Sequence, residues 1–126
     1  MRSKERRAHL RYRCDLPIGL RADESHVYEL RIHELSLGGM RIACDNIMLN
    51  QLLAQGIKTA PAHQVFFDII LNAGHEQALS LRAQALGVLR ESQNRFIIRF
   101  QFHDMKPDLV QSLATMIEQY CESNPI

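Results

Sequence analysis

Four arginines fall within eight residues near the start of the chain, in the segment RRAHLRYR at positions 6–13. Residues 1–13 hold six basic residues against one acidic residue, a net charge of +5, whereas the rest holds nine basic and thirteen acidic residues, a net charge of −4. Guanidinium groups bind phosphate oxygens through paired hydrogen bonds. The segment therefore indicates an anionic partner, usually phosphate, although a solvated tail that improves solubility is the alternative.

A second candidate stretch is HELSLGG, residues 33–39. Two glycines after a serine predict a tight reversal that needs either a positive φ or the approach of a ligand too close to permit a side chain. Ser36 can donate and accept hydrogen bonds, and Glu34 can accept two donors. Alone, such a stretch is more typical of a turn than of a binding site.

The other reactive side chains favour neither catalysis nor a metal site. Ser36 and His33 suggest a nucleophile and a base, but no GxSxG turn is present, and residues three apart in a strand face opposite sides. Three cysteines, without CxxC spacing, favour reduced thiols over a disulfide framework. The histidines are dispersed, without metal-ligand spacing, at positions 9, 26, 33, 63, 75 and 103. We therefore expect no enzyme, no metal and no cofactor.

Period-two alternation of apolar residues dominates the chain and predicts half-buried strands. The dipeptide Gln93-Asn94 predicts a hairpin, and Gly87 predicts a bend within a long strand. The predicted strands are LPIGLRA (16–22), YELRIHEL (28–35), MRIAC (40–44), VFFDIIL (65–71), ALSLRAQALGVLRES (78–92) and RFIIRFQF (95–102). Between the third and fourth, residues 46–63 predict a short helical turn and a loop.

The period changes once, near the C-terminus, where an amphipathic helix is predicted at about 107–122. Pro107 suits its first turn, and Asp108 lies near its positive end. Six strands followed by one helix predict a mainly β fold, a six-stranded antiparallel barrel with a C-terminal α-helix. We expect a flexible basic arm at 1–13 and one domain at 14–126.

The charged N-terminus is unlike a signal peptide. The longest apolar run, VFFDIIL, is interrupted by Asp68 and is too short to span a bilayer. We therefore expect a cytoplasmic protein without membrane insertion.

Taken together, Arg7-x-x-x-Arg11 and Ser36-x-x-Gly39 resemble the motifs of the PilZ domain, the bacterial receptor module for cyclic di-GMP. That family has an RxxxR motif before its first strand and an [Asp/Asn]-x-Ser-x-x-Gly motif in a following strand region. The resemblance covers nearly the whole chain, because PilZ domains are six-stranded antiparallel split barrels, commonly with a C-terminal helix.

Two details qualify the match. Arg2-x-x-x-Arg6 also satisfies RxxxR, but Arg7 and Arg11 lie next to the first strand. Residue 34 is Glu where the family has Asp or Asn, which keeps an acceptor but adds a methylene group.

The resemblance implies that the arm closes over cyclic di-GMP while the barrel presents polar groups to it. An arginine directly before RxxxR, here Arg6, is associated in the family with a stacked pair of ligands, so we expect two molecules per chain. The implied ligand-binding residues are Arg6, Arg7, Arg11, Glu34, Ser36 and Gly39, with His9 inside the clamp.

Three functions remain open at this point. The first is a second-messenger receptor that reorders its arm on binding and signals through an unidentified partner protein. The second is a PilZ-like adaptor that has lost nucleotide binding, an alternative favoured by Glu34. The third is a small barrel that binds single-stranded nucleic acid, but the absence of Trp, the 6% aromatic content and the acidic body argue against it.

Overall fold

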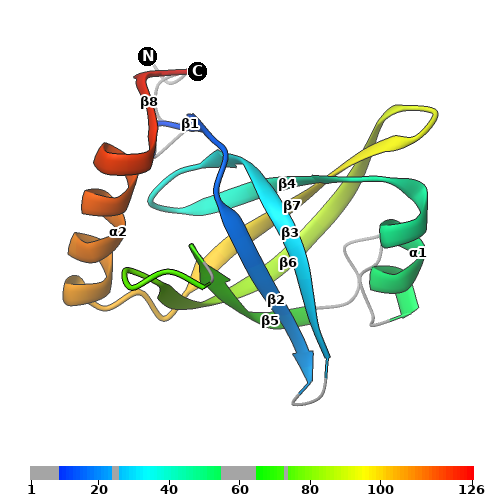
Figure 1. The fold of residues 1–126 in the computed structure, drawn as a ribbon, viewed down its shortest axis with the longest axis horizontal. Coiled ribbons are helices and arrows are strands. Elements are labelled where there is room, and N and C mark those ends of the chain that lie inside the picture. Colours follow the sequence, from blue (N-terminus) through cyan, green and yellow to red (C-terminus); the bar gives the residue numbers. More distant parts are fainter. Residues whose placement is uncertain (1–8, 24–25, 55–64, 73) are drawn as a thin grey trace.

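The computed structural model describes residues 9–23, 26–54, 65–72 and 74–126. In this part of the chain, strands form a barrel, and a helix lies on each of two opposite sides of it (Figure 1). The elements in chain order are β1 (Tyr12–Cys14), β2 (Pro17–Asp23), β3 (His26–Leu35), β4 (Gly39–Cys44), α1 (Asn46–Ala54), β5 (Val65–Leu71), β6 (Leu79–Ser92), β7 (Arg95–His103), α2 (Pro107–Tyr120) and β8 (Cys121–Pro125).

Six of these strands close into a barrel. They follow the order β2-β5-β6-β7-β4-β3, and an additional β2–β3 pairing joins the two ends. Every pairing is antiparallel. Closure removes the free edges that an open sheet would expose. The predicted six-stranded antiparallel barrel with a C-terminal helix is confirmed.

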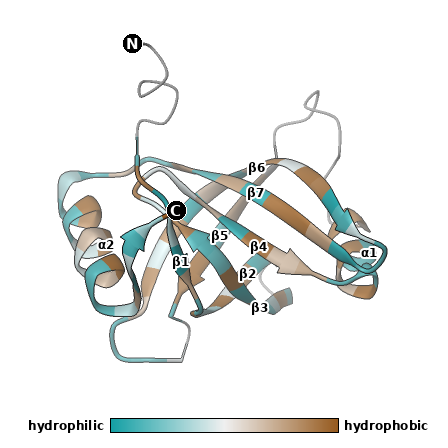
Figure 2. Cartoon of the chain, turned by 90° about the horizontal axis from the view of Figure 1, so that it is seen from above, coloured by the Kyte–Doolittle hydropathy of each residue, from teal (hydrophilic) through white to brown (hydrophobic). Residues whose placement is uncertain are grey.

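Alternating side chains place the core inside the barrel. Ile18, Leu20 and Ile42 are almost completely buried, and the intervening residues face outward. Apolar and polar bands alternate along β6 and β7 in the same way (Figure 2). The two-residue hairpin between these strands forms as predicted, and the pairing shifts between Ala85 and Gly87, where a bend was expected.

Helix α2 packs onto the barrel through one face, burying Leu113, Met116 and Ile117. Pro107 begins it, as predicted, but it ends at Tyr120 rather than near residue 122. The next residue is already extended, because Cys121 pairs with Cys14 of β1.

Helix α1 follows β4 and is longer than the predicted turn. The carboxylate of Asp45 accepts a hydrogen bond from the backbone N–H of Met48 at 2.9 Å, which caps the first turn. Leu49 and Leu52 are buried, and this packing stabilises the helix. None of the described helices is long and apolar enough to cross a bilayer.

The two short strands β1 and β8 were not predicted. Strand β1 pairs with β3 on one side and with β8 on the other, which extends the sheet beyond the barrel. Tyr12 and Arg13, assigned to the arm on sequence grounds, lie in β1. The chain therefore enters the barrel along an ordered strand, with Arg11 directly before it.

Candidate ligand-binding site

The β3–β4 connection is a tight turn held by Ser36. The backbone N–H of Ser36 donates to the carbonyl of Gly39 at 2.9 Å. The hydroxyl oxygen accepts from the backbone N–H groups of Gly38 at 3.2 Å and Gly39 at 3.1 Å, and the hydroxyl donates to the Gly39 carbonyl at 3.2 Å. All the hydrogen-bonding capacity of this buried hydroxyl is thus used within the turn.

Both glycines of the turn are explained by close approach within the protein. Gly39 pairs with Gln101 of β7, and a Cβ atom added to it would lie 2.2 Å from the carbonyl oxygen of Phe100. A Cβ atom on Gly38 would lie 2.5 Å from the imidazole of His9. Neither glycine has a positive φ, so that sequence-based alternative is wrong. The position that a Gly39 side chain would take is thus filled by the backbone of β7.

Among the predicted site residues of the basic arm, His9 lies directly against the Ser36 turn. Its ring lies against Gly38, so the residues just before β1 run beside the Ser36 turn. Arg6 and Arg7 fall outside the described residues.

Arg11 and Glu34 form an ion pair next to this turn. The Nη1 of Arg11 lies 3.3 Å from Oε1 of Glu34, and the side chains are 23% and 13% exposed, respectively. Two further cationic or titratable groups approach the same carboxylate: the Nε of Arg41 lies 4.0 Å from Oε1, and the Nε2 of His33 lies 3.9 Å from Oε2. The structure therefore brings two predicted site residues, Arg11 and Glu34, into contact with each other.

Two polar atoms of this pair make no hydrogen bond to the described residues, although Oε1 of Glu34 lies within ion-pair distance of Arg11 and Arg41. The Nε of Arg11 and the Oε1 of Glu34 are buried without a hydrogen-bond partner among the described residues. A buried polar atom without a partner costs about 1–3 kcal/mol, more where it is charged. A ligand that offers an acceptor to Arg11 and a donor to Glu34 would remove this cost.

Sequence reasoning missed two arginines of the site. Residues 34, 41 and 99 are successive partners across β3, β4 and β7, so Arg41 and Arg99 lie directly opposite each other. Like charges on facing strand positions are destabilising unless an anion lies between or above them. The signal was present in the sequence, since both arginines occupy outward positions of their alternating strands.

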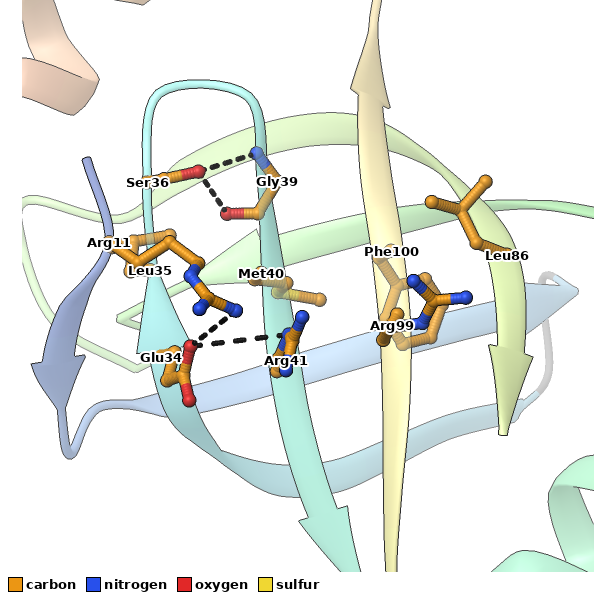
Figure 3. Close-up of a pocket in the computed structure, with 10 residues that line it drawn as sticks. All are labelled: Arg11, Glu34, Leu35, Ser36, Gly39, Met40, Arg41, Leu86, Arg99 and Phe100. Carbon is orange, nitrogen blue, oxygen red and sulfur yellow. Dashed lines mark hydrogen bonds and ion pairs between the residues drawn. The ribbon is translucent and has the colours of Figure 1, made fainter. Parts of the chain in front are cut away.

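These residues line one open pocket of about 150 Å³, which Figure 3 shows from outside the barrel. Arg11, Glu34 and Arg41 group on one side, while Arg99 and Leu86 come from neighbouring strands. Leu86 is 37% exposed and offers an apolar surface to a flat ring. The pocket thus combines guanidinium groups, one carboxylate and one apolar wall, the groups that a purine nucleotide requires.

The described residues contain no group of three histidine, cysteine, aspartate or glutamate side chains placed to hold a metal ion. His33 contacts the carboxylate of Glu34, whereas the hydroxyl of Ser36 bonds the turn. The pair suggested by the sequence therefore does not form a nucleophile and base.

Comparisons with known proteins bear on the family and the fold. The family model described as PilZ domain matches residues 5–119. The PilZ domain of YcgR from Escherichia coli, solved with c-di-GMP, has a TM-score of 0.66 at 19% identity, and the alignment covers 90% of each chain. No curated protein matches the chain.

Two larger proteins contain a similar fold. MrkH of K. pneumonia in complex with c-di-GMP has a TM-score of 0.65 at 16% identity, over 90% of this chain and 51% of that one. PlzA of Borreliella burgdorferi in complex with c-di-GMP has a TM-score of 0.55 at 12% identity, over 94% of this chain and 53% of that one. The present chain spans about half the length of each.

Proposed function

Because the chain belongs to the PilZ domain family, we propose that it is a receptor for cyclic di-GMP that binds at the Arg11–Glu34 pocket. Structures of similar fold that contain c-di-GMP support the proposal. The observation that carries it is the pair of unsatisfied buried atoms, Nε of Arg11 and Oε1 of Glu34. A guanine base supplies donors on N1 and N2 and acceptors on O6 and N7, and the ligand's phosphates supply further acceptors.

Binding then exchanges one set of charge contacts for another. Arg11 turns part of its guanidinium from Glu34 to a phosphate or a guanine edge, and Glu34 accepts from the guanine N–H groups. Arg41 and Arg99, opposite each other on the strands, offset the phosphate charge. Ser36 and Gly39 hold the backbone of the turn that presents these groups.

We extend this proposal to the basic arm and to the way in which the protein signals. Arg6 and Arg7 close over the ligand from the arm, a second ligand molecule stacks on the first, and the reordered arm presents a new surface to a partner protein. Ordering the arm takes part of the binding free energy. We also propose that the protein acts by binding and not by catalysis, in the bacterial cytoplasm, without inserting into membranes.

One observation favours a second candidate, an adaptor that does not bind nucleotide. The Arg11–Glu34 contact at 3.3 Å already pairs the two charges that the ligand would use. The longer side chain of glutamate, where the family has Asp or Asn, makes this contact possible. In that case the same surface serves protein contact alone.

Isothermal titration with cyclic di-GMP separates the two candidates. The receptor predicts heat of binding in the wild type and a loss of about a hundredfold or more in affinity for Arg11→Ala, ~3 kcal/mol for charged hydrogen bonds. Arg95→Ala is the matched control, because Arg95 pairs with Glu91 at the β6–β7 hairpin. Absence of heat with the wild type at excess ligand would support the adaptor.

A parallel titration addresses nucleic acid. MrkH is described as a transcription regulatory factor, so a single-stranded and a double-stranded DNA oligonucleotide belong in the same experiment. We predict no binding to either at physiological salt, because the residues beyond the arm carry a net charge of −4.

A further inference from the structure

Two of the three cysteines lie opposite each other outside the ligand-binding pocket. Cys14 in β1 and Cys121 in β8 are direct partners in the antiparallel pairing of these strands. Cross-strand partners have Cα atoms about 4.5–5.5 Å apart. A disulfide requires about 4.4–6.8 Å. The backbone thus already has the spacing of a disulfide, although all three cysteines are free thiols in this structure.

The two thiols differ in reactivity. The pKa of Cys121 is lowered because the Cys14 thiol donates a hydrogen bond to its sulfur, an effect that outweighs desolvation. The pKa of Cys14 is raised by the same hydrogen bond and by burial. Cys121 is therefore the more acidic thiol of the pair, and Cys14 holds its proton more strongly.

Solvent reaches the pair through a pocket of about 360 Å³ that is lined by Cys14 and by both chain neighbours of Cys121. Arg13 and His33 also line this pocket, together with the acidic Asp15 and Glu122. A small polar oxidant has room to enter. Cys44 contrasts with this pair, because burial and the neighbouring Asp45 raise its pKa to about 11.

We propose that Cys14 and Cys121 form a reversible disulfide in response to peroxide, which locks the C-terminal strand β8 onto β1. The thiolate of Cys121 attacks hydrogen peroxide, so that an S–O bond forms, the O–O bond breaks, and hydroxide leaves. That hydroxide takes the proton of the Cys14 thiol, and the Cys14 sulfur then attacks the Cys121 sulfur. An S–S bond forms, the S–O bond breaks, and a second hydroxide leaves and takes up the proton that Cys121 had lost to solvent. Two thiols lose two electrons, and one peroxide is reduced to two water molecules.

The cross-link acts on a strand that touches the ligand-binding site. The backbone N–H of Ile126, directly after β8, donates to the carbonyl of Arg11 at 2.8 Å. Strand β1 is only three residues long, so its position depends on the strands at its two sides. Fixing β8 at Cys121 therefore fixes the backbone that presents Arg11.

Peptide mapping tests the bond directly. Trypsin places the three cysteines in separate peptides, 14–21, 42–58 and 100–126, because the Lys106–Pro107 bond resists cleavage. After peroxide treatment of the full chain, we expect peptides 14–21 and 100–126 to be linked, with the loss of two hydrogen atoms, and to separate on reduction. Cys121→Ser abolishes the link, whereas Cys44→Ser keeps it. Because Cys14 is buried, Cys121→Ser is the safer variant for folding.

Hydrogen exchange supplies a second readout. Amides of residues 121–126 exchange more slowly in the oxidised protein than in the reduced protein, and Cys121→Ser shows no change with peroxide. Stable sulfinic acid at Cys121, a link that uses Cys44, or a disulfide between two chains would each overturn the proposal. So would an intramolecular bond that leaves exchange in 121–126 unaltered.

A consequence for the ligand rests on the proposed function. Holding Arg11 in place lowers the ordering cost of binding, so the oxidised protein binds cyclic di-GMP a few-fold more tightly. If the peptides are linked but cyclic di-GMP binds neither the oxidised nor the reduced protein, the proposed function is contradicted. The disulfide proposal is then still supported. If the peptides are linked and both redox forms bind cyclic di-GMP with equal affinity, the coupling of the disulfide to the binding site is overturned.

Discussion

At the scale of single residues, Glu34 is the main departure from the PilZ motif, and the structure gives it a definite contact. Its extra methylene group brings Oε1 to 3.3 Å from Arg11. The same carboxylate lies near Arg41 and His33. The residue therefore acts in two opposing ways, as an acceptor that a guanine can use and as a competitor for the arginine that the ligand needs.

Glu34→Asp tests which effect is larger. The shorter side chain draws the carboxylate back from Arg11 and restores the family pattern, so we expect cyclic di-GMP to bind about fivefold more tightly, a gain of ~1 kcal/mol, the size of one hydrogen bond. Titration calorimetry of the variant beside the wild type measures the change. A weaker affinity would mean that the longer side chain is adapted to this ligand.

The opposed arginines give a prediction that sequence motifs alone do not make. Arg99→Ala removes one of two facing charges, and among the described residues Arg99 has no carboxylate partner whose loss would complicate the result. We expect the unliganded protein to keep its thermal midpoint, and affinity for cyclic di-GMP to fall about tenfold or less, ~1 kcal/mol for an exposed charge. The salt dependence of binding should also become shallower. Unchanged affinity and salt dependence would place the phosphates elsewhere.

At the scale of elements, the turn between β3 and β4 is held by contacts within the protein. Ser36 satisfies its backbone groups, and Gly39 permits β4 to approach β7. The motif Ser-x-x-Gly thus fixes where strand β3 ends and where the outward face of Glu34 lies. The role expected for these two residues as direct ligand contacts remains a prediction.

Two adjacent glycine variants separate these roles. Gly39→Ala drives a Cβ atom into the backbone of Phe100, so we expect a loss of roughly 2–3 kcal/mol in the free energy of unfolding. Gly38→Ala meets only the ring of His9, which can rotate away, and should change stability by less than about 0.5 kcal/mol. Urea unfolding of both variants gives the comparison. Equal losses would show that His9 is held as rigidly as the backbone.

The sequence predicted the barrel well because its strands bury one face. Leu20, Ile42 and Ile98 face the core, each next to an arginine on the opposite face, and that period sets both the strands and their register. Strands β1 and β8 escaped prediction, because three and five residues are too few to show a period-two pattern. The sequence predicted the motif residues of the site but not Arg41 and Arg99. These two arginines lie opposite each other because of the pairing of β4 with β7, and a single sequence does not show that pairing.

At the scale of the whole molecule, charge and fold place the site at the point where the chain enters the barrel. The described N-terminal residues run beside the Ser36 turn, and the C-terminal strand pairs with β1 (Figure 1). The residues just before β1 and the residue that follows β8 therefore meet at Arg11. Arg11, the last motif arginine, thus lies in the pocket itself.

The number of ligands per chain follows from the same arrangement. The pocket, at about 150 Å³, is smaller than a cyclic dinucleotide, so a ligand there stands largely outside the barrel and leaves one face uncovered. A second molecule can stack on that face, but it brings the phosphate charges to four, and their repulsion must be offset. Arg6, the residue directly before the first motif arginine, is the guanidinium we expect to supply that charge. We therefore predict two molecules of cyclic di-GMP per chain, with Arg6→Ala reducing the number to one, whereas Arg11→Ala removes both because it contacts the inner molecule. Calorimetric stoichiometry and native mass spectrometry of the three proteins in one buffer measure this. One ligand on the wild type, or two on Arg6→Ala, would mean that the arm meets the ligand in a different register.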